Sequence, residues 1–390
     1  MKKKILFLCS NMRIGGFQKS LVSLLQYFDY EKYDVDLLLF RPEGVFMSLI
    51  PEQVKIIPPP IIPDYLESTK EALPILLKKH KIGLLLWRAF SGCMSAINKG
   101  VGAWLLSRAI PKLHGKHYDI VIDYNGQWQL YYMVDKIDGI KKYSYFHSDY
   151  AKWKYYLYTD RIYYQKVDAI VTVSDDCMLS MQKLFPRQKG KIYCIENIIA
   201  DKTVNIYPIG SNNFQDDFSG KRLVTVGRVC SDKGLDYALE ACRILKEQGE
   251  RFRWYWIGPY TDLSLLKERT ATLNINEEFV FLGATDNPYD YMRNAYLLIH
   301  PSKFEGKAVA VEESKVLAIP VVATNYSTVS NQIVDGENGS IVEMNADALA
   351  KKIKYYLQHP ELREKQHAYM LRNCTGNAKE IDKLYELIED

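Results

Sequence analysis

The sequence lacks the cysteine pairs that a disulfide framework or a structural zinc site requires. Its seven cysteines are odd in number, and no two of them form a Cys-x-x-Cys pair, which predicts reduced thiols. Long apolar runs are also missing, since no stretch approaches the roughly 20 residues of a membrane-spanning helix. The apolar run that follows residues 2–4 is too short for a secretory signal. These absences favour a cytoplasmic protein.

Metal-ligand and nucleophile motifs are missing as well. No cluster of His, Cys, Asp or Glu has the spacing of a metal site, and the Asp34-Val35-Asp36 pair lies at the start of an expected strand instead of in a loop. The G-x-S-x-G pattern of serine hydrolases does not occur. We therefore expect neither a bound metal ion nor a cofactor.

The sequence does contain a long alternation of short apolar runs and helical patterns. We expect strands at residues 4–9, 35–40, 120–123, 143–147, 169–173, 191–195, 223–227, 254–258, 279–283, 297–300 and 321–324. Helical patterns lie between them, for example at residues 16–28, 235–247, 264–272 and 309–317. Such alternation predicts an α/β fold with parallel sheets covered on both faces.

Residues 201–221 interrupt this alternation with Asn, Asp, Ser and Gly, and we interpret them as a linker. The 390 residues are enough for two domains. We predict two doubly wound, Rossmann-like domains at residues 1–200 and 222–375, facing each other across an interdomain cleft. Ligands in such sheets bind beyond the carboxyl ends of the strands, so motifs at strand ends are the candidates for function.

The first candidate motif is Val226-Gly227-Arg228, which continues to Lys233 and Gly234. It follows an expected strand and opens an expected helix. The forked guanidinium of Arg228 and the compact charge of Lys233 suit a diphosphate. The alternative is a pair of solvated surface cations, but the position at a strand end favours the functional interpretation.

The second candidate motif is the strand–turn–helix segment at residues 301–313, with carboxylates at Glu305 and Glu313. Glu305 lies in the turn and suits sugar hydroxyls. Glu313 lies within an apolar pattern, so we expect it to face inward and accept the hydroxyls of a ribose, whereas its neighbour Glu312 is expected to be solvated. A helix start favours anions, so the residues that would present backbone N–H groups to phosphate are Gly306, Lys307, Ala308 and Val309.

The N-terminal half has two weaker candidates. Gly15 and Gly16 follow the first strand, where paired glycines allow a ligand to approach the backbone. On its own, such a pair is more typical of a plain turn. His147 ends another expected strand, and a structural histidine is as good an interpretation as one that contacts a sugar.

A basic segment at residues 78–112 combines cations with an apolar stripe. Between Lys70 and Lys116 there are nine Lys or Arg residues and one acidic residue. The apolar residues at helical spacing are Trp87, Phe90, Met94, Ile97, Val101 and Trp104, surrounded by Lys78, Lys79, Lys81, Arg88, Lys99, Arg108 and Lys112. We interpret the segment as a helical stripe that contacts an anionic membrane surface, with core packing as the alternative. No nucleic-acid-binding module accompanies the charge, so we do not expect nucleic acid as a partner.

These motifs together resemble the retaining, nucleotide-sugar-dependent glycosyltransferases of family 4, which have the GT-B fold. The matching segments are Gly15-Gly16, residues 146–149, 173–174, 196–197, 226–234, Glu305-x7-Glu313 and 320–324. The resemblance covers nearly the whole chain, and the C-terminal motifs are the more specific. It implies that the first domain binds the acceptor, that the second binds a nucleotide sugar, and that a final helix at residues 376–390 crosses back to the first domain.

The resemblance also implies roles for individual residues. Arg228 and Lys233 would bind the donor diphosphate and stabilise it as it leaves, and Glu305 would hold the donor sugar. Glu313 would bind the ribose, and His147 would contact the sugar. The remaining substrate-binding positions would be Gly15, Gly16, Asn197, Gly227, Gly306, Lys307, Ala308 and Val309. No metal is needed in this family.

Two positions depart from the family pattern, because Lys307 stands where many members have an aromatic residue and Ala318 where many have Gly. The Glu-Gly-Lys variant is similar to that of capsule and surface-polysaccharide transferases. The resemblance thus implies transfer of a hexose or N-acetylhexosamine from a UDP-sugar to a lipid-linked saccharide, at the inner face of the plasma membrane. A nucleotide-sugar epimerase and a non-catalytic nucleotide-sugar-binding subunit are the alternatives.

Overall fold

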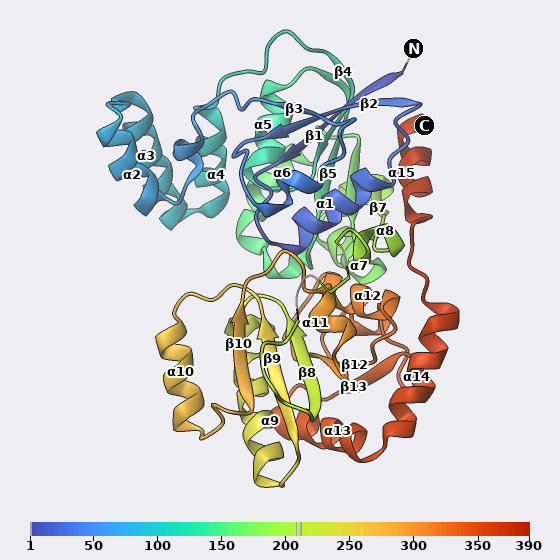
Figure 1. Ribbon diagram of the computed structural model, residues 1–390. Helices are drawn as coiled ribbons and strands as arrows, with labels where there is room; N and C mark the ends of the chain where they lie inside the picture. Colours follow the sequence, from blue (N-terminus) through green and yellow to red (C-terminus); the bar gives the residue numbers. More distant parts are fainter. Residues whose placement is uncertain (1, 208, 211–212) are drawn as a thin grey trace. The chain divides into compact units, whose positions relative to one another are not determined.

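The alternating runs of the sequence fold into two parallel sheets with helices packed against them (Figure 1). The computed structural model describes residues 2–207, 209–210 and 213–390. The described residues divide into unit 1, which comprises the residues up to Glu196 together with Glu380–Asp390, and unit 2, which comprises Asn197–Lys379. Residues 208, 211 and 212 of the predicted linker lie outside the described residues.

Unit 1 contains a seven-stranded sheet in the order β3-β2-β1-β4-β5-β6-β7. Its strands are β1 (Lys3–Cys9), β2 (Tyr33–Leu39), β3 (Lys55–Ile57), β4 (Tyr118–Asp123), β5 (Gly139–Phe146), β6 (Ala169–Thr172) and β7 (Ile192–Cys194). Its α-helices are α1 (Gly16–Gln26), α2 (Thr69–Lys78), α3 (Ile82–Ile97), α4 (Lys99–Arg108), α5 (Trp128–Lys136), α6 (Leu157–Tyr163), α7 (Asp175–Leu184) and α15 (Glu380–Glu389).

Unit 2 contains a six-stranded sheet in the order β10-β9-β8-β11-β12-β13. Its strands are β8 (Lys221–Val226), β9 (Phe252–Ile257), β10 (Phe279–Gly283), β11 (Leu297–His300), β12 (Val321–Thr324) and β13 (Gly339–Val342). Its α-helices are α8 (Asp201–Val204), α9 (Leu235–Glu247), α10 (Leu263–Thr272), α11 (Tyr289–Arg293), α12 (Val309–Val316), α13 (Ala346–Gln358) and α14 (Pro360–Asn373).

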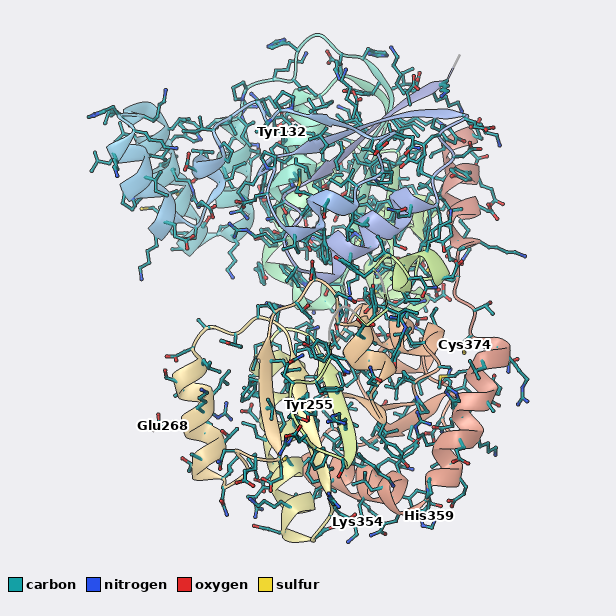
Figure 2. All side chains as sticks on the ribbon, in the orientation of Figure 1. Tyr132, Tyr255, Glu268, Lys354, His359 and Cys374 are labelled. Atoms are coloured by element: carbon teal, nitrogen blue, oxygen red, sulfur yellow. The ribbon has the colours of Figure 1, made fainter. Side chains whose placement is uncertain are left out.

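Both faces of the unit 2 sheet are buried. Successive residues of a strand point to opposite sides of a sheet, and here both sets of side chains are covered. In β9, Trp254 and Trp256 belong to the core under α9 and α13. Tyr255 and Ile257 belong to a second core on the other face, under α11 and α12. Figure 2 shows Tyr255 inside the unit, whereas Glu268 lies on the outer side of α10. Strands buried on both faces account for the nearly continuous apolar runs in the sequence.

The final helix α15 packs on unit 1 through aromatic and backbone contacts. The ring of Tyr385 lies 5.6 Å from that of Phe28 and 5.4 Å from that of Tyr33. On β5, the hydroxyl of Tyr143 donates a 2.6 Å hydrogen bond to the carbonyl of Leu387. Helix α15 therefore packs against residues of β2 and β5.

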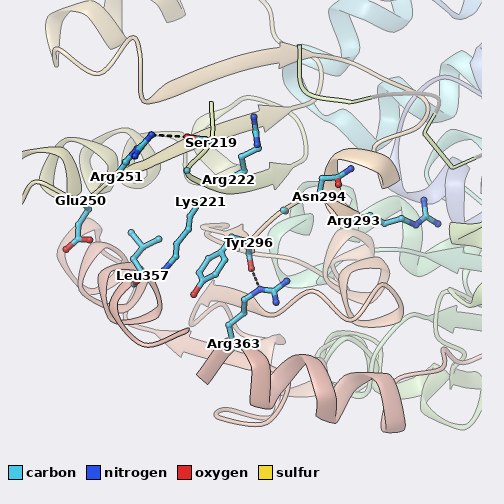
Figure 3. Close-up of a pocket in the computed structure, with 12 residues that line it drawn as sticks. Ser219, Lys221, Arg222, Glu250, Arg251, Arg293, Asn294, Tyr296, Leu357 and Arg363 are labelled. Atoms are coloured by element: carbon cyan, nitrogen blue, oxygen red, sulfur yellow. Dashed lines mark hydrogen bonds between the residues drawn. The ribbon is translucent and has the colours of Figure 1, made fainter. Parts of the chain in front are cut away.

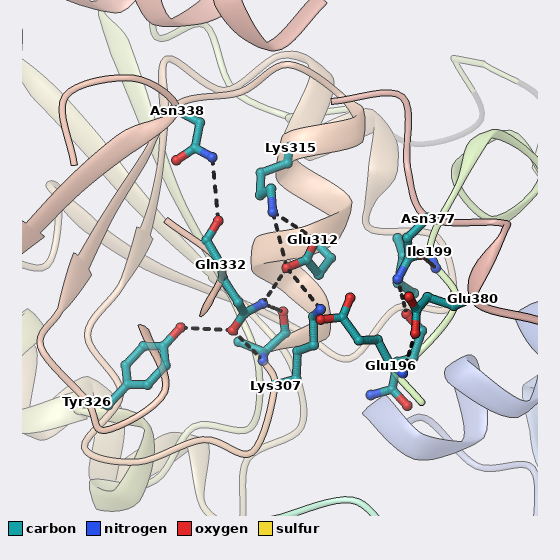
Figure 4. Close-up of polar contacts among 12 residues, drawn as sticks. Glu196, Ile199, Lys307, Glu312, Lys315, Tyr326, Gln332, Asn338, Asn377 and Glu380 are labelled. Atoms are coloured by element: carbon teal, nitrogen blue, oxygen red, sulfur yellow. Dashed lines mark hydrogen bonds and ion pairs between the residues drawn. The ribbon is translucent and has the colours of Figure 1, made fainter. Parts of the chain in front are cut away.

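Two short segments connect the units, one on each side of unit 2 in the sequence (Figure 4). The Glu196 N–H donates to a carboxylate oxygen of Glu380 at 3.0 Å within unit 1. Within unit 2, the Ile199 N–H donates to Asn377 Oδ1 at 2.8 Å, and Asn377 Nδ2 donates to the Asn197 carbonyl at 3.0 Å. Through its backbone carbonyl, Asn197 thus helps to fix a connecting segment.

The apolar stripe predicted from Trp87 to Trp104 lies on two helices, α3 and α4, and not on one. Asn98 separates them with an extended backbone, and its side chain accepts a 3.1 Å hydrogen bond from the Val101 N–H. Asparagine is a preferred N-cap because its side chain satisfies a free N–H of the first turn. Gly102 packs so closely on Ser95 that a side-chain carbon there would lie 1.9 Å from its hydroxyl oxygen. The prediction of a single stripe was therefore wrong.

Both sheets follow the Rossmann order, in which the strand sequence reverses direction once. The reversal lies between β1 and β4 in unit 1 and between β8 and β11 in unit 2. At this point the loops that follow two neighbouring strands run in opposite directions, which leaves a space between them. Such sheets bind ligands in that space. Residues 227–234 and 301–308 leave the two strands at the reversal in unit 2.

Candidate functional site

The loops after β8 and β11 are tied together in unit 2. The Lys303 N–H donates a 2.9 Å hydrogen bond to the carbonyl of Asp232. Gly234 has a φ of 78°, and a side-chain carbon there would lie 1.8 Å from the carbonyl oxygen of Pro301. Only glycine combines that backbone conformation with so close a contact. This contact brings the end of one loop, with Lys233, against the start of the other.

Lys233 and Glu305 form an ion pair across the two loops. The Lys233 ammonium lies 2.6 Å from Glu305 Oε1. The same oxygen accepts a 2.7 Å hydrogen bond from the Ser302 hydroxyl and lies 3.0 Å from His300 Nε2. Burial opposes ionisation of Glu305, but Lys233 and His300 outweigh it and hold the pKa of this carboxyl well below its usual range. Glu305 is therefore a carboxylate at neutral pH and can only accept hydrogen bonds.

The sequence predicted Lys233 and Glu305 but not the two residues that complete this cluster. His300 is the last residue of β11, and Ser302 lies three positions before Glu305. The Ser-x-x-Glu spacing was a local indication that could have identified Ser302. His300 is buried, and its ring packs edge-on against Tyr326 at 5.7 Å. Nothing in the sequence distinguishes it from an ordinary core histidine.

Gly227 and Arg228 lie at the carboxyl end of β8. The Gly227 carbonyl accepts a 2.8 Å bond from Trp256 Nε1, and a side-chain carbon on Gly258 would lie 1.9 Å from it. The missing side chain of Gly258 thus permits a close approach between the ends of β8 and β9. Arg228 is exposed, and among the described residues it has no carboxylate within ion-pair distance. Its guanidinium is accordingly available to an external anion.

Gln332 holds the backbone at the start of α12 (Figure 4). Its Oε1 accepts from the Ala308 N–H at 2.8 Å, and its Nε2 donates to the Ala308 carbonyl at 2.9 Å. This pairing corrects the expectation that the Ala308 N–H is offered to phosphate, because that N–H already has a partner in the protein. Val309 begins α12, and N–H groups in a first helical turn have no partner within the helix. Gly306 and Lys307 lie in the turn directly before it.

Glu312 belongs to a buried network (Figure 4), contrary to the expectation that it is solvated. It lies 3.0 Å from the Lys315 ammonium and 4.0 Å from that of Lys307, and it accepts a 2.9 Å bond from Gln332 Nε2. A charge is buried at acceptable cost only when it is paired and hydrogen-bonded. The side chain of Lys307 is also buried, 3% exposed. It therefore contributes to this network and does not point into solvent.

Glu313 faces inward, as its place in the apolar pattern predicted. It is 1% exposed, and its Oε1 accepts a 2.9 Å hydrogen bond from the Tyr289 hydroxyl. Burial and the neighbouring carboxylate raise the pKa of Tyr289 well above its ordinary value, so this hydroxyl keeps its proton and remains a donor. Tyr289 lies on α11, and the sequence did not identify it as a partner of Glu313.

The N-terminal candidates lie together in unit 1. Gly15 caps α1 with an extended backbone, and exposed Gly16 begins the helix. The next residue, Phe17, places its ring 6.2 Å from that of His147. His147 Nε2 lies 3.0 Å from the Tyr124 carbonyl. Because a carbonyl can only accept, Nε2 carries a hydrogen, and the imidazole orientation is fixed by the end of β4.

The described residues contain no group of three or more His, Cys, Asp or Glu side chains that could hold a metal ion. In the same part of the chain, every helix is too short or too polar to cross a bilayer.

The two-unit architecture matches solved structures over nearly their whole lengths. Among them is HepE from Anabaena in complex with UDP and glucose, with a TM-score of 0.70, 14% identity and 99% of both chains covered. Another is a mutant of TarM from S. aureus in complex with Fondaparinux, alpha-GlcNAc-glycerol and UDP, with a TM-score of 0.71, 13% identity and 100% of both chains covered. The chain has the GT-B fold. This confirms the predicted pair of Rossmann-like α/β domains.

Residues 213–371 match the family model described as Glycosyl transferases group 1. The capsular polysaccharide biosynthesis glycosyltransferase CapM of Staphylococcus aureus is 28% identical over 36% of this chain and 37% of its own length. A Campylobacter jejuni relative is 29% identical over 57% of this chain and 58% of its own. It is an N-acetylgalactosamine-N,N'-diacetylbacillosaminyl-diphospho-undecaprenol 4-alpha-N-acetylgalactosaminyltransferase. The matches thus span about two fifths to three fifths of these relatives.

Proposed function

We propose that the chain is a retaining, metal-independent glycosyltransferase of family 4. In this proposal it moves a hexose or N-acetylhexosamine from a UDP-sugar to a lipid-linked saccharide in bacterial surface-polysaccharide synthesis. The observation that supports it most is the ionised Glu305, paired with Lys233 at the strand-order reversal of unit 2. The glycosyl transferases group 1 match includes both residues. The UDP in HepE supports the choice of nucleotide, and the undecaprenol-linked substrate in the Campylobacter relative's name supports the acceptor.

Each charged residue has a role in this proposal. Arg228 and Lys233 bind the donor diphosphate and stabilise the negative charge that develops as it leaves. An ammonium has three donors, so Lys233 can hold Glu305 and a phosphate oxygen together. Glu305 accepts hydrogen bonds from hydroxyls of the donor sugar, and Glu313 accepts them from the ribose. The first-turn N–H of Val309 faces phosphate.

The proposed reaction keeps the configuration of the transferred sugar. The acceptor hydroxyl attacks the anomeric carbon on the face from which the diphosphate departs. The bond between the anomeric carbon and the phosphate oxygen breaks as the new glycosidic bond forms. The proton of the acceptor hydroxyl passes to the leaving phosphate. Cations around that phosphate provide the stabilisation that this charge requires.

Thermal unfolding with nucleotide sugars tests the donor. A ligand at about 100 times its Kd adds roughly 2.7 kcal/mol to the free energy of unfolding. We expect UDP-sugars to raise the Tm, and GDP- and ADP-sugars to leave it unchanged. Release of UDP from the bound sugar should then require a saccharide acceptor. Failure of every nucleotide sugar to bind or react would contradict the proposal. Conversion of the donor alone into an epimer would favour an epimerase, and binding without turnover would favour a non-catalytic subunit.

We also propose that α2 and α3 attach the protein to an anionic membrane, at its cytoplasmic face. The apolar side chains exposed on these helices and between them are Leu77, Ile82, Leu86, Trp87, Phe90 and Ile97. Lys78 and Lys81 lie beside them in sequence, and their charge complements anionic headgroups. Arg88 is not part of this surface, because it is buried and donates to Thr69 Oγ1 at 2.7 Å and to the Glu67 carbonyl at 2.7 Å.

Vesicle sedimentation tests this attachment with the double variant Leu86→Asp/Phe90→Asp. The intact protein should bind phosphatidylglycerol vesicles and should release as salt increases, because salt screens surface charge. The double variant should bind about tenfold less tightly or weaker, because burying each such apolar side chain contributes about 1.5–3 kcal/mol. Leu265→Asp on α10, also at an exposed leucine, is the control and should bind like the parent. Equal binding by all three proteins would contradict the attachment.

A further inference from the structure

A polar cavity lies at the edge of the unit 2 sheet opposite to the candidate site (Figure 3). Its volume is about 690 Å³. Lys221 begins β8, and Arg251 and Tyr296 directly precede β9 and β11, so the cavity lies at the amino ends of these strands. The candidate site follows the carboxyl ends. Six residues of β8 separate the two edges by about 20 Å, so the cavity is a separate site.

The lining of this cavity is strongly cationic. Its charged side chains are Lys221, Arg222, Arg251, Arg293, Arg363 and Glu250. Asp216 neutralises Arg222 at 2.8 Å, and Asp290 lies 3.4 Å from Arg293. Glu250 accepts a 2.6 Å bond from Gln358 and lies 3.9 Å from the Lys354 ammonium.

Three of these cations have no carboxylate at ion-pair distance among the described residues. Across the part of the chain that the structure describes, no carboxylate lies within 4.0 Å of the charged atoms of Lys221, Arg251 or Arg363. Arg222 Nε is also buried without a hydrogen-bond partner among the described residues. Surface cations are commonly unpaired, but three of them around one cavity create a positive potential that attracts anions.

Two of the unpaired cations are held in place before any ligand binds. The Lys221 ammonium donates to the carbonyl of Leu357 and lies 4.6 Å from the ring centroid of Tyr296. Arg363 Nε donates to the Tyr296 carbonyl at 3.0 Å, and its guanidinium carbon lies 5.3 Å from the same ring. Because both side chains are already ordered, an anion would bind with little further loss of conformational entropy.

We propose that this cavity binds the phosphate group of a small phosphorylated molecule, at a site separate from the donor site. A phosphate matches the forked donors of arginine and the point charge of lysine. The cavity is within the roughly 300–1,000 Å³ range of small-molecule sites, so it has room for an organic portion beside Tyr296 and Leu357. A phospholipid headgroup has the same phosphate chemistry, and the experiment below separates the two sources.

Calorimetry with glucose 1-phosphate tests the proposal in a Lys233→Ala background, which removes the phosphate-binding lysine of the candidate site. The Lys233→Ala protein should bind this probe. Adding Arg251→Glu and Arg363→Gln should weaken binding at least about tenfold, because the first substitution reverses a positive charge at the cavity and the second removes one. Adding Lys267→Glu, a charge reversal at an exposed position on α10, is the matched control and should leave binding unchanged.

Two further measurements distinguish loss of phosphate binding from misfolding and from binding to a lipid headgroup. Arg251 is exposed, so Arg251→Glu alone should weaken binding while its far-UV circular dichroism and Tm match the parent. Absence of binding by the Lys233→Ala protein, or equal binding by the Arg251→Glu variant, would overturn the proposal. Binding to phosphatidylglycerol vesicles that depends on Arg251, without binding of glucose 1-phosphate, would overturn it in favour of a lipid headgroup.

Discussion

Replacing Glu305 with glutamine is expected to lower kcat by about 10²–10³-fold while the protein remains folded, because it removes the ion pair that holds Lys233, a group proposed to stabilise the charge that develops on the leaving diphosphate. Glutamine keeps the shape of the side chain but removes the charge that pairs with Lys233. Its amide also offers donors where sugar hydroxyls need an acceptor. Initial rates of sugar transfer at saturating donor, together with the KM, would measure the loss.

The control for this substitution is Glu268→Gln. Glu268 is exposed on α10 (Figure 2), so its variant should have the kcat and Tm of the parent. A drop in kcat for Glu305→Gln with unchanged KM and Tm is the expected pattern for a group that acts in the transition state. A Glu305→Gln protein as active as the Glu268→Gln protein would exclude the proposed role.

The Glu305→Gln comparison also has an expected pH dependence. The folded-state pKa of Glu305 is depressed, so its charge stabilises the fold fully above the unfolded value of about 4.3. That contribution is lost as the pH falls below about 4.3 toward the lower folded-state pKa. The difference in free energy of unfolding between parent and variant should therefore be constant at pH 6–8 and decrease toward pH 3. Urea unfolding at each pH would measure it.

The sequence was most informative where a local pattern decides the structure. The runs that became β1, β8 and β11 are buried on both faces, and their apolar character predicted them. The edge strands β3 and β13 were missed because each contains only two apolar residues, in the sequences Lys-Ile-Ile and Gly-Ser-Ile-Val. Edge strands have only one neighbour, so packing imposes less apolar pattern on them than on central strands.

The sequence was least informative where distant segments meet. Gln332 lies 24 positions from Ala308, whose backbone it holds, and nothing near either residue predicts the contact. The error at Glu312 has the same origin, because Lys307 and Gln332 bury it from outside its own helix. The helix break at Asn98 was different, since an asparagine before a helical run is a local indication of an N-cap.

Ala318, which departs from the family pattern, has an unusual backbone conformation. It has a φ of 56° directly after α12, the left-handed conformation that usually ends a helix on glycine. Many members of the resembled family have glycine at this position, and the backbone explains why. An alanine in this conformation lowers the free energy of unfolding by roughly 1–2 kcal/mol relative to glycine. The cost lies at the end of α12 and not in the loops that hold Lys233 and Glu305.

Gly234→Ala is expected to lower both the stability of the protein and its transfer activity. The φ of 78° at this position costs alanine roughly 1–2 kcal/mol. The added carbon would also lie 1.8 Å from the carbonyl oxygen of Pro301, so one of the two loops must move. A displacement of about 1 Å in a catalytic group can lower the rate about 10²-fold. The loops that move are those holding Lys233 and Glu305.

The matched control is Gly249→Ala at the other end of the same helix, α9. Gly249 has a φ of 76°, but no atom lies within 4 Å of the position that an added carbon would occupy. Both variants therefore bear the same backbone cost, and only Gly234→Ala bears the collision with Pro301. Urea unfolding should show Gly234→Ala to be less stable than Gly249→Ala by about 1–3 kcal/mol, the usual cost of overpacking. Transfer activity should fall in Gly234→Ala alone. Equal stability and activity in the two variants would mean that the contact with Pro301 does not position Lys233, because the loops would then absorb the added carbon without separating the ion pair.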